Sequence, residues 1–198
     1  VNIILAPGCY YEAMGIPQYW RARDADEIGD FYLKELTDGV GTTGLRPGVI
    51  KSATGMEITN NEEKCLAGAA MAQRQAGCAI ITHTEHSRHG DKQQDIFEKN
   101  GAVMDRVLIG HQDEQTSPDP IIALAQRGTF VGVDRIGLDM LNSDEVRADN
   151  GVPMKALVEE RRPSAAPAPM AMAPALATQA EPVCSVSASG RYASTPVV

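Results

Sequence analysis

The chain has 198 residues, of which 43% are hydrophobic, and this size suits one folded core rather than two. It is short for a complete eight-stranded β/α barrel, which typically needs about 250 residues. The net charge of -8, from 18 Lys and Arg against 26 Asp and Glu, argues against a nucleic-acid-binding surface and favours a small neutral or cationic substrate.

Five short apolar runs predict β-strands. They cover residues 2–6, 49–52, 79–82, 106–110 and 129–133. Four of the segments between or beside them have a helical pattern. Two of the predicted helices span residues 26–37 and 92–99. Another begins with Thr59 as its cap, with Glu62 three residues on, and ends near Gly77. The last begins with Asp119 as its cap and Pro120 at the first helical position, and it ends at Gly128.

Alternating strands and helices without hairpin signals indicate parallel strands joined by helical crossovers. The fold class is therefore α/β, and periodicity alone leaves a barrel and a doubly wound sheet open. After Asn150 the composition changes, since residues 162–198 are dominated first by Ala, Pro and Met and then by Ser and Val. We expect a disordered C-terminal tail there and an uncertain helical extension over residues 151–161.

The cysteines are scattered without a C-x-x-C pair, so we expect reduced, mostly structural thiols. They are Cys9, Cys65, Cys78 and Cys184. The apolar stretches are strand-sized, which predicts no membrane segment. The chain opens on an apolar strand-like run instead of a basic region followed by an apolar one, so we expect a cytoplasmic protein whose sequence begins within a domain.

Functional side chains follow four of the predicted strands, at the edge where β/α folds hold their active sites. These residues are Lys51, His83, His111 and Arg135. Each has an ordinary alternative, because a strand-end His is often only hydrogen-bonded and a Lys often extends to solvent. Two His and one Lys at equivalent ends nevertheless indicate a convergent metal site, since imidazole is a frequent zinc ligand.

Other polar residues near this edge are harder to interpret. His86 and His89 lie in a Gly-flanked polar loop, for which simple solvation is the preferred interpretation. Asp113 and Glu114 after His111 are either acids that support the site or plain loop charges.

The sequence runs that contain Lys51, His83, His111 and Arg135 resemble the phosphotriesterase family, including its lactonase-like members, within the amidohydrolase superfamily. The runs are residues 48–51 with 53–55, 81–84, 107–111 and 133–139, and the resemblance extends from about Asn2 to about Asn150. It implies a partial TIM-type (β/α)8 barrel over residues 1–150, roughly strands 3 to 7 of eight.

The resemblance also implies roles for individual residues. A carboxylated Lys51 would bridge two metal ions, Zn2+ or another divalent metal, and His83 and His111 would bind one of them, so these three would be the catalytic residues. Arg135 would lie at the substrate pocket. Tyr10 belongs to a Tyr-Tyr pair that matches a stretch common after the third barrel strand, and we expect it to contact substrate.

Two parts of the family pattern are missing from this sequence. No His-x-His pair from a first strand precedes Val1, and no apolar strand ending in aspartate follows Asn150. We therefore expect a fragment or frameshifted product with open sheet edges.

The leading hypothesis is a metal-dependent hydrolase in which a metal-bound hydroxide attacks an ester, lactone or organophosphate. The alternative is a catalytically silent truncated remnant with at most weak zinc binding. A cofactor-binding doubly wound domain is disfavoured, because the glycine pattern of residues 39–44 follows a helix instead of a strand. The expected partner is a small ester or lactone, without nucleic acid or membrane, and a homodimer remains open.

Overall fold

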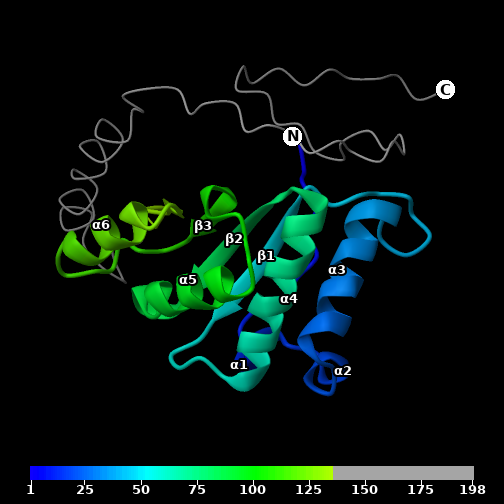
Figure 1. Cartoon of the computed structure of the whole chain (residues 1–198), viewed down its shortest axis with the longest axis horizontal. Helices are drawn as coiled ribbons and strands as arrows, with labels where there is room; N and C mark the ends of the chain where they lie inside the picture. Colours follow the sequence, from blue (N-terminus) through cyan, green and yellow to red (C-terminus); the bar gives the residue numbers. More distant parts are fainter. Residues whose placement is uncertain (136–198) are drawn as a thin grey trace.

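In the computed structural model, residues 1–135 are described, and they form a parallel sheet of four strands (Figure 1). The strands are β1 (Val49–Thr54), β2 (Ala79–Thr84), β3 (Val107–Ile109) and β4 (Phe130–Val131). Their order in the sheet, β1-β2-β3-β4, is the order along the chain. Each strand therefore pairs with the next one, as in a sheet that winds in one direction only.

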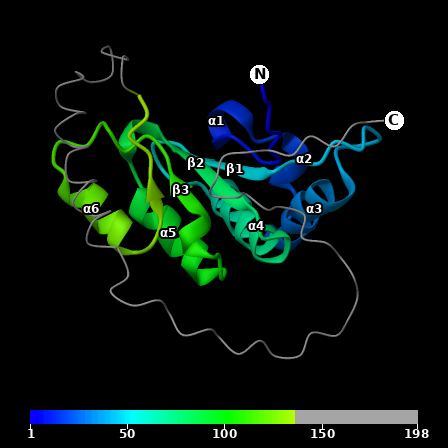
Figure 2. The ribbon, with the colours of Figure 1, turned by 90° about the horizontal axis from the view of Figure 1, so that it is seen from above.

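Helices precede the first strand and connect the strands to one another. They are α1 (Glu12–Gly15), α2 (Gln18–Arg21), α3 (Ala25–Asp38), α4 (Asn60–Ala76), α5 (Gly90–Lys99) and α6 (Asp119–Gln126), with 3-10 turns η1 (Glu85–Ser87) and η2 (Met104–Arg106). Figure 2 shows α3, α4 and α5 on one side of the strands and α1 on the other. Among residues 1–135, no helix is long and apolar enough to cross a membrane.

Local sequence signals explain where α4 begins and ends. Thr59 accepts a hydrogen bond from the backbone N–H of Glu62, and the Glu62 side chain accepts one from the N–H of Thr59, so the predicted capping box is confirmed. Gly77 ends the helix with φ 71°, a left-handed conformation that glycine adopts without steric cost. The α3 helix has a similar box between Asp24 and Glu27, which the sequence interpretation did not identify.

The hydrophobic core lies between the sheet and its helices. Ile50, Ile80 and Ile109 are fully buried, as are Leu66 of α4 and Phe97 of α5. Removing this apolar surface from water is the main stabilising contribution to the fold.

The opposite face of the sheet is less covered. Ile81 of β2 pairs in register with Leu108 of β3, and Leu108 pairs with Phe130 of β4, so these side chains share one face. Ile81 and Leu108 are half-buried, and Phe130 is 64% exposed. A hollow of about 570 Å³, lined in part by Ala79 and Phe130, lies on the amino-end side of these strands, away from the predicted site.

Some boundaries differ from those predicted. Residues 2–6 form no regular strand, although two backbone bonds hold their segment beside β1: Gly48 N–H donates to the Leu5 oxygen at 3.0 Å, and Lys51 N–H to the Pro7 oxygen at 2.9 Å. One isolated parallel bridge, Gly8 to Lys51, is too little for a strand. In α6 the cap position is Pro118, and the Asp119 side chain caps nothing. The predictions for residues 151–161 and 162–198 lie outside the described residues.

Candidate active site

Lys51 and His83 lie on the less covered face of the sheet. Lys51 pairs in register with Ile81, and His83 follows Ile81 by two positions, so the alternation of a strand directs all three side chains to one face. The prediction that Lys51 ends its strand is wrong, because β1 continues to Thr54 through pairing with β2. Lys51 is therefore set back from the edge where His83 lies.

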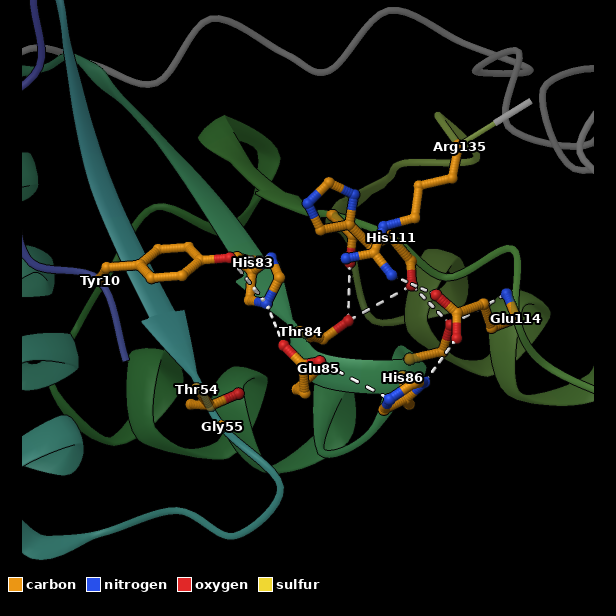
Figure 3. A network of polar contacts seen from close by, with 12 residues as sticks. Tyr10, Thr54, Gly55, His83, Thr84, Glu85, His86, His111, Glu114 and Arg135 are labelled. Carbon is orange, nitrogen blue, oxygen red and sulfur yellow. Dashed lines mark hydrogen bonds and ion pairs between the residues drawn. The ribbon is translucent and has the colours of Figure 1, made fainter. Parts of the chain in front are cut away.

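The structure brings His83 and His111 together. Their ring centroids are 4.8 Å apart in an edge-to-face arrangement, and His83 is 3% exposed. His111 follows β3 by two residues and has a positive φ of 57°. Gly110 makes this turn possible, since a Cβ there would lie 2.4 Å from the Thr82 backbone oxygen. Two of the three predicted ligands thus meet at the carboxyl rim of the sheet (Figure 3).

Both imidazoles have acidic partners that the sequence interpretation missed. Nε2 of His83 lies 3.0 Å from the Glu85 carboxylate, and Nδ1 of His111 lies 2.6 Å from that of Asp134. The signals were weak: Glu85 is two residues beyond His83, and Asp134 is adjacent to Arg135. Such partners orient an imidazole and set which nitrogen carries the proton.

Tyr10 extends toward His83, as Figure 3 shows, and its hydroxyl group is 3.2 Å from each ring nitrogen. Tyr11 stacks on the same imidazole with centroids 5.6 Å apart. A hollow of about 410 Å³ opens beside Tyr11, and Glu12, Glu57, Glu62, Glu85 and His86 are among the residues that line it.

Burial changes the protonation of Lys51 and His83 in the same direction. Burial lowers the pKa of the Lys51 amine, against an opposing effect of the Asp134 charge. Burial also lowers the pKa of His83, and the hydrogen bond to Glu85 opposes this while the nearby His111 and Lys51 reinforce it. Both groups are therefore shifted toward their neutral forms, which are the forms that can accept a metal ion or react as nucleophiles.

Arg135 is held at the rim by two acidic residues. Its guanidinium group pairs with the Glu114 carboxylate, and its backbone N–H donates to Oδ2 of Asp113 at 3.0 Å. Glu114 also contacts Nδ1 of His86 at 2.9 Å. Asp113 and Glu114, which the sequence left undecided, thus position Arg135. The solvated interpretation of His86 and His89 is incomplete, since Nε2 of His89 lies 2.9 Å from the Met56 oxygen.

The donor set can be compared with the two-metal site that the resemblance implies. In the described part of the chain, no three His, Cys, Asp or Glu side chains gather in a way that could hold a metal ion. The candidate set is two imidazoles and Lys51, which becomes an anionic oxygen ligand only when its amine is carboxylated. An amine whose pKa is lowered by partial burial is suited to that reaction, because the neutral form attacks carbon dioxide. These residues fit one part of such a site.

The parallel sheet and the helices between its strands define a segment of a β/α barrel. Its polar residues lie at the rim where barrel enzymes have their active sites. The sequence profile of the Phosphotriesterase family matches residues 1–162. The chain belongs to the phosphotriesterase family.

Individual relatives agree with this assignment. The chain is 33% identical over 142 residues to an aryldialkylphosphatase of Saccharolobus solfataricus, covering 71% of this chain and 45% of the relative. It is 32% identical over 149 residues to the phosphotriesterase homology protein of Escherichia coli, with 74% and 51% covered. It is 27% identical over 145 residues to the N-acetyltaurine hydrolase of Homo sapiens, with 72% and 41% covered.

A solved structure also matches this chain, with a TM-score of 0.71 and 32% identity. It comes from the molecular engineering of organophosphate hydrolysis activity from a weak promiscuous lactonase template. The match covers 79% of this chain and 50% of that one. The prediction of a partial barrel is confirmed. The chain spans about half the length of the curated relatives it matches.

Proposed function

We propose that this chain supplies the central active-site strands of a metal-dependent hydrolase that acts on an ester bond in a lactone or an organophosphate. The observation that carries the proposal is the 4.8 Å approach of His83 and His111 at the carboxyl rim, together with the half-buried Lys51 on the same face, whose amine has a lowered pKa. Membership of a family whose relatives carry hydrolase names supports it. The catalytically silent remnant is not favoured by that membership.

On this proposal, His83, His111 and a carboxylated Lys51 hold zinc or another divalent metal. When bound, the metal would polarise the carbonyl or phosphoryl oxygen of the substrate and lower the pKa of a water molecule. Glu85 and Asp134 keep the two imidazoles in a fixed orientation through their contacts at 3.0 and 2.6 Å.

The neighbouring residues suit a small uncharged or cationic substrate. Tyr10 and Arg135 lie on either side of the histidine pair (Figure 3), where they would contact the acyl or phosphoryl group. The hollow beside Tyr11 is lined by four glutamates, so an anionic substrate would be repelled there.

The test is metal content and turnover after reconstitution with zinc or cobalt and bicarbonate. Substrates should include a lactone, an aryl dialkyl phosphate and, since one relative is named an N-acetyltaurine hydrolase, an N-acetylated amine. We expect Lys51→Ala and His111→Ala to lose metal and ester turnover, whereas Lys34→Ala, an exposed lysine paired with Asp38, should retain both. Metal binding and turnover unchanged in Lys51→Ala would contradict the proposal, and turnover confined to the amide would contradict the substrate class.

A further inference from the structure

Two cysteine thiols from distant parts of the chain meet next to the segment that carries Tyr10. Cys9 immediately precedes that tyrosine, and Cys65 lies in the second turn of α4, with its thiol hydrogen-bonded to that of Cys9. The hydroxyl group of Tyr32 in α3 donates to the Cys9 sulfur at 3.4 Å. The exposed fractions of Cys9, Cys65 and Tyr32 are 5%, 4% and 1%. Three elements therefore share one buried sulfur cluster outside the candidate active site.

The two thiols are chemically unequal. Hydrogen bonds from Cys65 and, less strongly, from Tyr32 lower the pKa of Cys9 from its ordinary value of 9.0 to about 7, although burial opposes them. The same contact with Cys9 raises the pKa of Cys65, and burial adds to this. Because the thiolate is the reactive form of cysteine, Cys9 is suited to attack an oxidant and Cys65 to react afterwards as the second thiol.

The segment that carries Cys9 is weakly held compared with the strands. Backbone bonds from Gly48 and Lys51, at 3.0 and 2.9 Å, and one isolated bridge between Gly8 and Lys51 join residues 1–8 to the edge of β1. Ile3 and Ile4 upstream are 81% and 62% exposed. A segment with few backbone bonds and little buried surface opens locally at low free-energy cost, which admits a small oxidant to a buried thiol.

We propose that Cys9 and Cys65 are a peroxide-reactive pair whose oxidation to a disulfide ties the segment bearing Tyr10 to α4. The Cys9 thiolate attacks one oxygen of hydrogen peroxide, the O–O bond breaks, and hydroxide leaves, which gives a sulfenic acid. The Cys65 thiolate then attacks that sulfur, the S–S bond forms, and the sulfenic oxygen leaves as hydroxide. The two thiol protons neutralise the two hydroxides, so two thiols and one peroxide give one disulfide and two waters.

Oxidation at this place reaches the candidate active site through the chain itself. Tyr10 follows Cys9 directly, and its hydroxyl group contacts His83. A disulfide would restrict how far Tyr10 can move from the imidazole. The covalent chemistry is independent of the proposed hydrolase function, because its products are observed without metal or substrate.

The experiment uses the full chain, first fully reduced and then treated with a few equivalents of hydrogen peroxide at pH 8. After unfolding and alkylation, intact mass and peptide mapping should show the loss of two hydrogens and a cross-link between the Cys9 and Cys65 peptides. The oxidised protein should also unfold at a higher temperature than the reduced protein, because the cross-link restricts the unfolded chain. Four alkylated thiols, or a disulfide that involves Cys78 or Cys184, would overturn the proposal.

Variants separate the roles of the two thiols. In Cys65→Ser, whose hydroxyl group can still donate to the Cys9 sulfur, the Cys9 sulfenic acid should persist and react with dimedone, whereas in Cys9→Ala the remaining Cys65 should not be labelled. Cys78→Ala is the matched control, since Cys78 is as buried as the pair, at 3% exposure, and the cross-link should form as before. Equal dimedone labelling of Cys65 and Cys9 would contradict the order in which the two thiols are assigned to react. The peptide map of the original sequence still tests for the cross-link if a variant fails to fold.

Discussion

The hydroxyl group of Tyr10 lies 3.2 Å from both ring nitrogens of His83, although the two residues are 73 positions apart in the chain. The rings are 4.7 Å apart between centroids. The N-terminal segment and β2 therefore meet at the carboxyl rim of the sheet, and this contact joins the weakly held segment to the candidate active site.

Removing this hydroxyl group should weaken that contact without changing the shape of the side chain. We expect Tyr10→Phe to lower the free energy of unfolding by about 0.5–1.5 kcal/mol, the usual range for one hydrogen bond. It should also move the ring nitrogen resonances of His83 in NMR spectra. Tyr19→Phe is the control, since Tyr19 is 58% exposed, and His83 resonances that respond equally to both variants would count against the contact.

Asp134 is expected to support metal binding through His111. Asn at this position keeps the size of the side chain but removes the charge that faces Nδ1 at 2.6 Å. Because carboxylate partners of ligand histidines typically affect metal affinity 10–100-fold, we expect Asp134→Asn to weaken zinc binding by about that factor. A competition titration with a chelator measures it. Glu57→Gln, whose side chain is 81% exposed, should bind zinc as the original chain does.

The Glu62 carboxylate is a buried acceptor that joins three segments. It accepts backbone N–H groups of Glu12 at 2.8 Å, Gly55 at 3.4 Å and Thr59 at 3.2 Å, and the residue is 2% exposed. Glu62→Gln replaces one acceptor oxygen with a donor, so it should lower the free energy of unfolding by about 1–3 kcal/mol.

Urea denaturation measures this loss, and the neighbouring Glu63 provides the control. Its side chain is 51% exposed and pairs with Lys99 at 3.9 Å, so Glu63→Gln should change stability by less than about 0.5 kcal/mol. Similar losses in the two variants would show that the carboxylate of Glu62 has no special role.

The reactivity of Cys9 should depend on pH with a midpoint near its pKa of about 7. Its thiolate form is favoured by the hydrogen bonds it accepts, so the fraction of thiolate rises as the pH passes upward through that value. Tyr32→Phe removes one of the two donors and should move the midpoint upward, toward the ordinary value of 9.0. Rates of alkylation of Cys9 between pH 6 and 9 give the midpoint, and an unchanged or lower value in Tyr32→Phe would contradict this account.

The order of strands and helices could be predicted from the sequence because each element has its own local pattern. Thr59, Glu62 and Gly77 mark the ends of α4 through contacts made within a few residues of one another. The strand predicted at residues 2–6 was wrong because local composition was the only signal used. That composition favours a strand, but a strand also requires a partner along its length. Here β1 supplies only a short contact.

The sequence also predicted that His83 and His111 lie near one rim, since the carboxyl ends of parallel strands meet there. His83 nevertheless lies within β2, which continues to Thr84, and only His111 follows its strand. The sequence could not identify Glu85 or Asp134 as their partners. Those contacts depend on ring orientation and on the turn at Gly110, which are set by packing between strands and not by any local pattern.

By itself, therefore, the sequence determined the α/β class, the parallel order of elements and the family, because periodicity, capping residues and strand-end motifs are properties of short segments. Only the tertiary structure decided that Lys51 is set back within β1, that Tyr10 contacts His83, and that Cys9 meets Cys65. Each of these relationships joins residues distant in the chain. Long-range pairs of this kind arise when strand register and helix packing bring whole elements together, and no local signal encodes them.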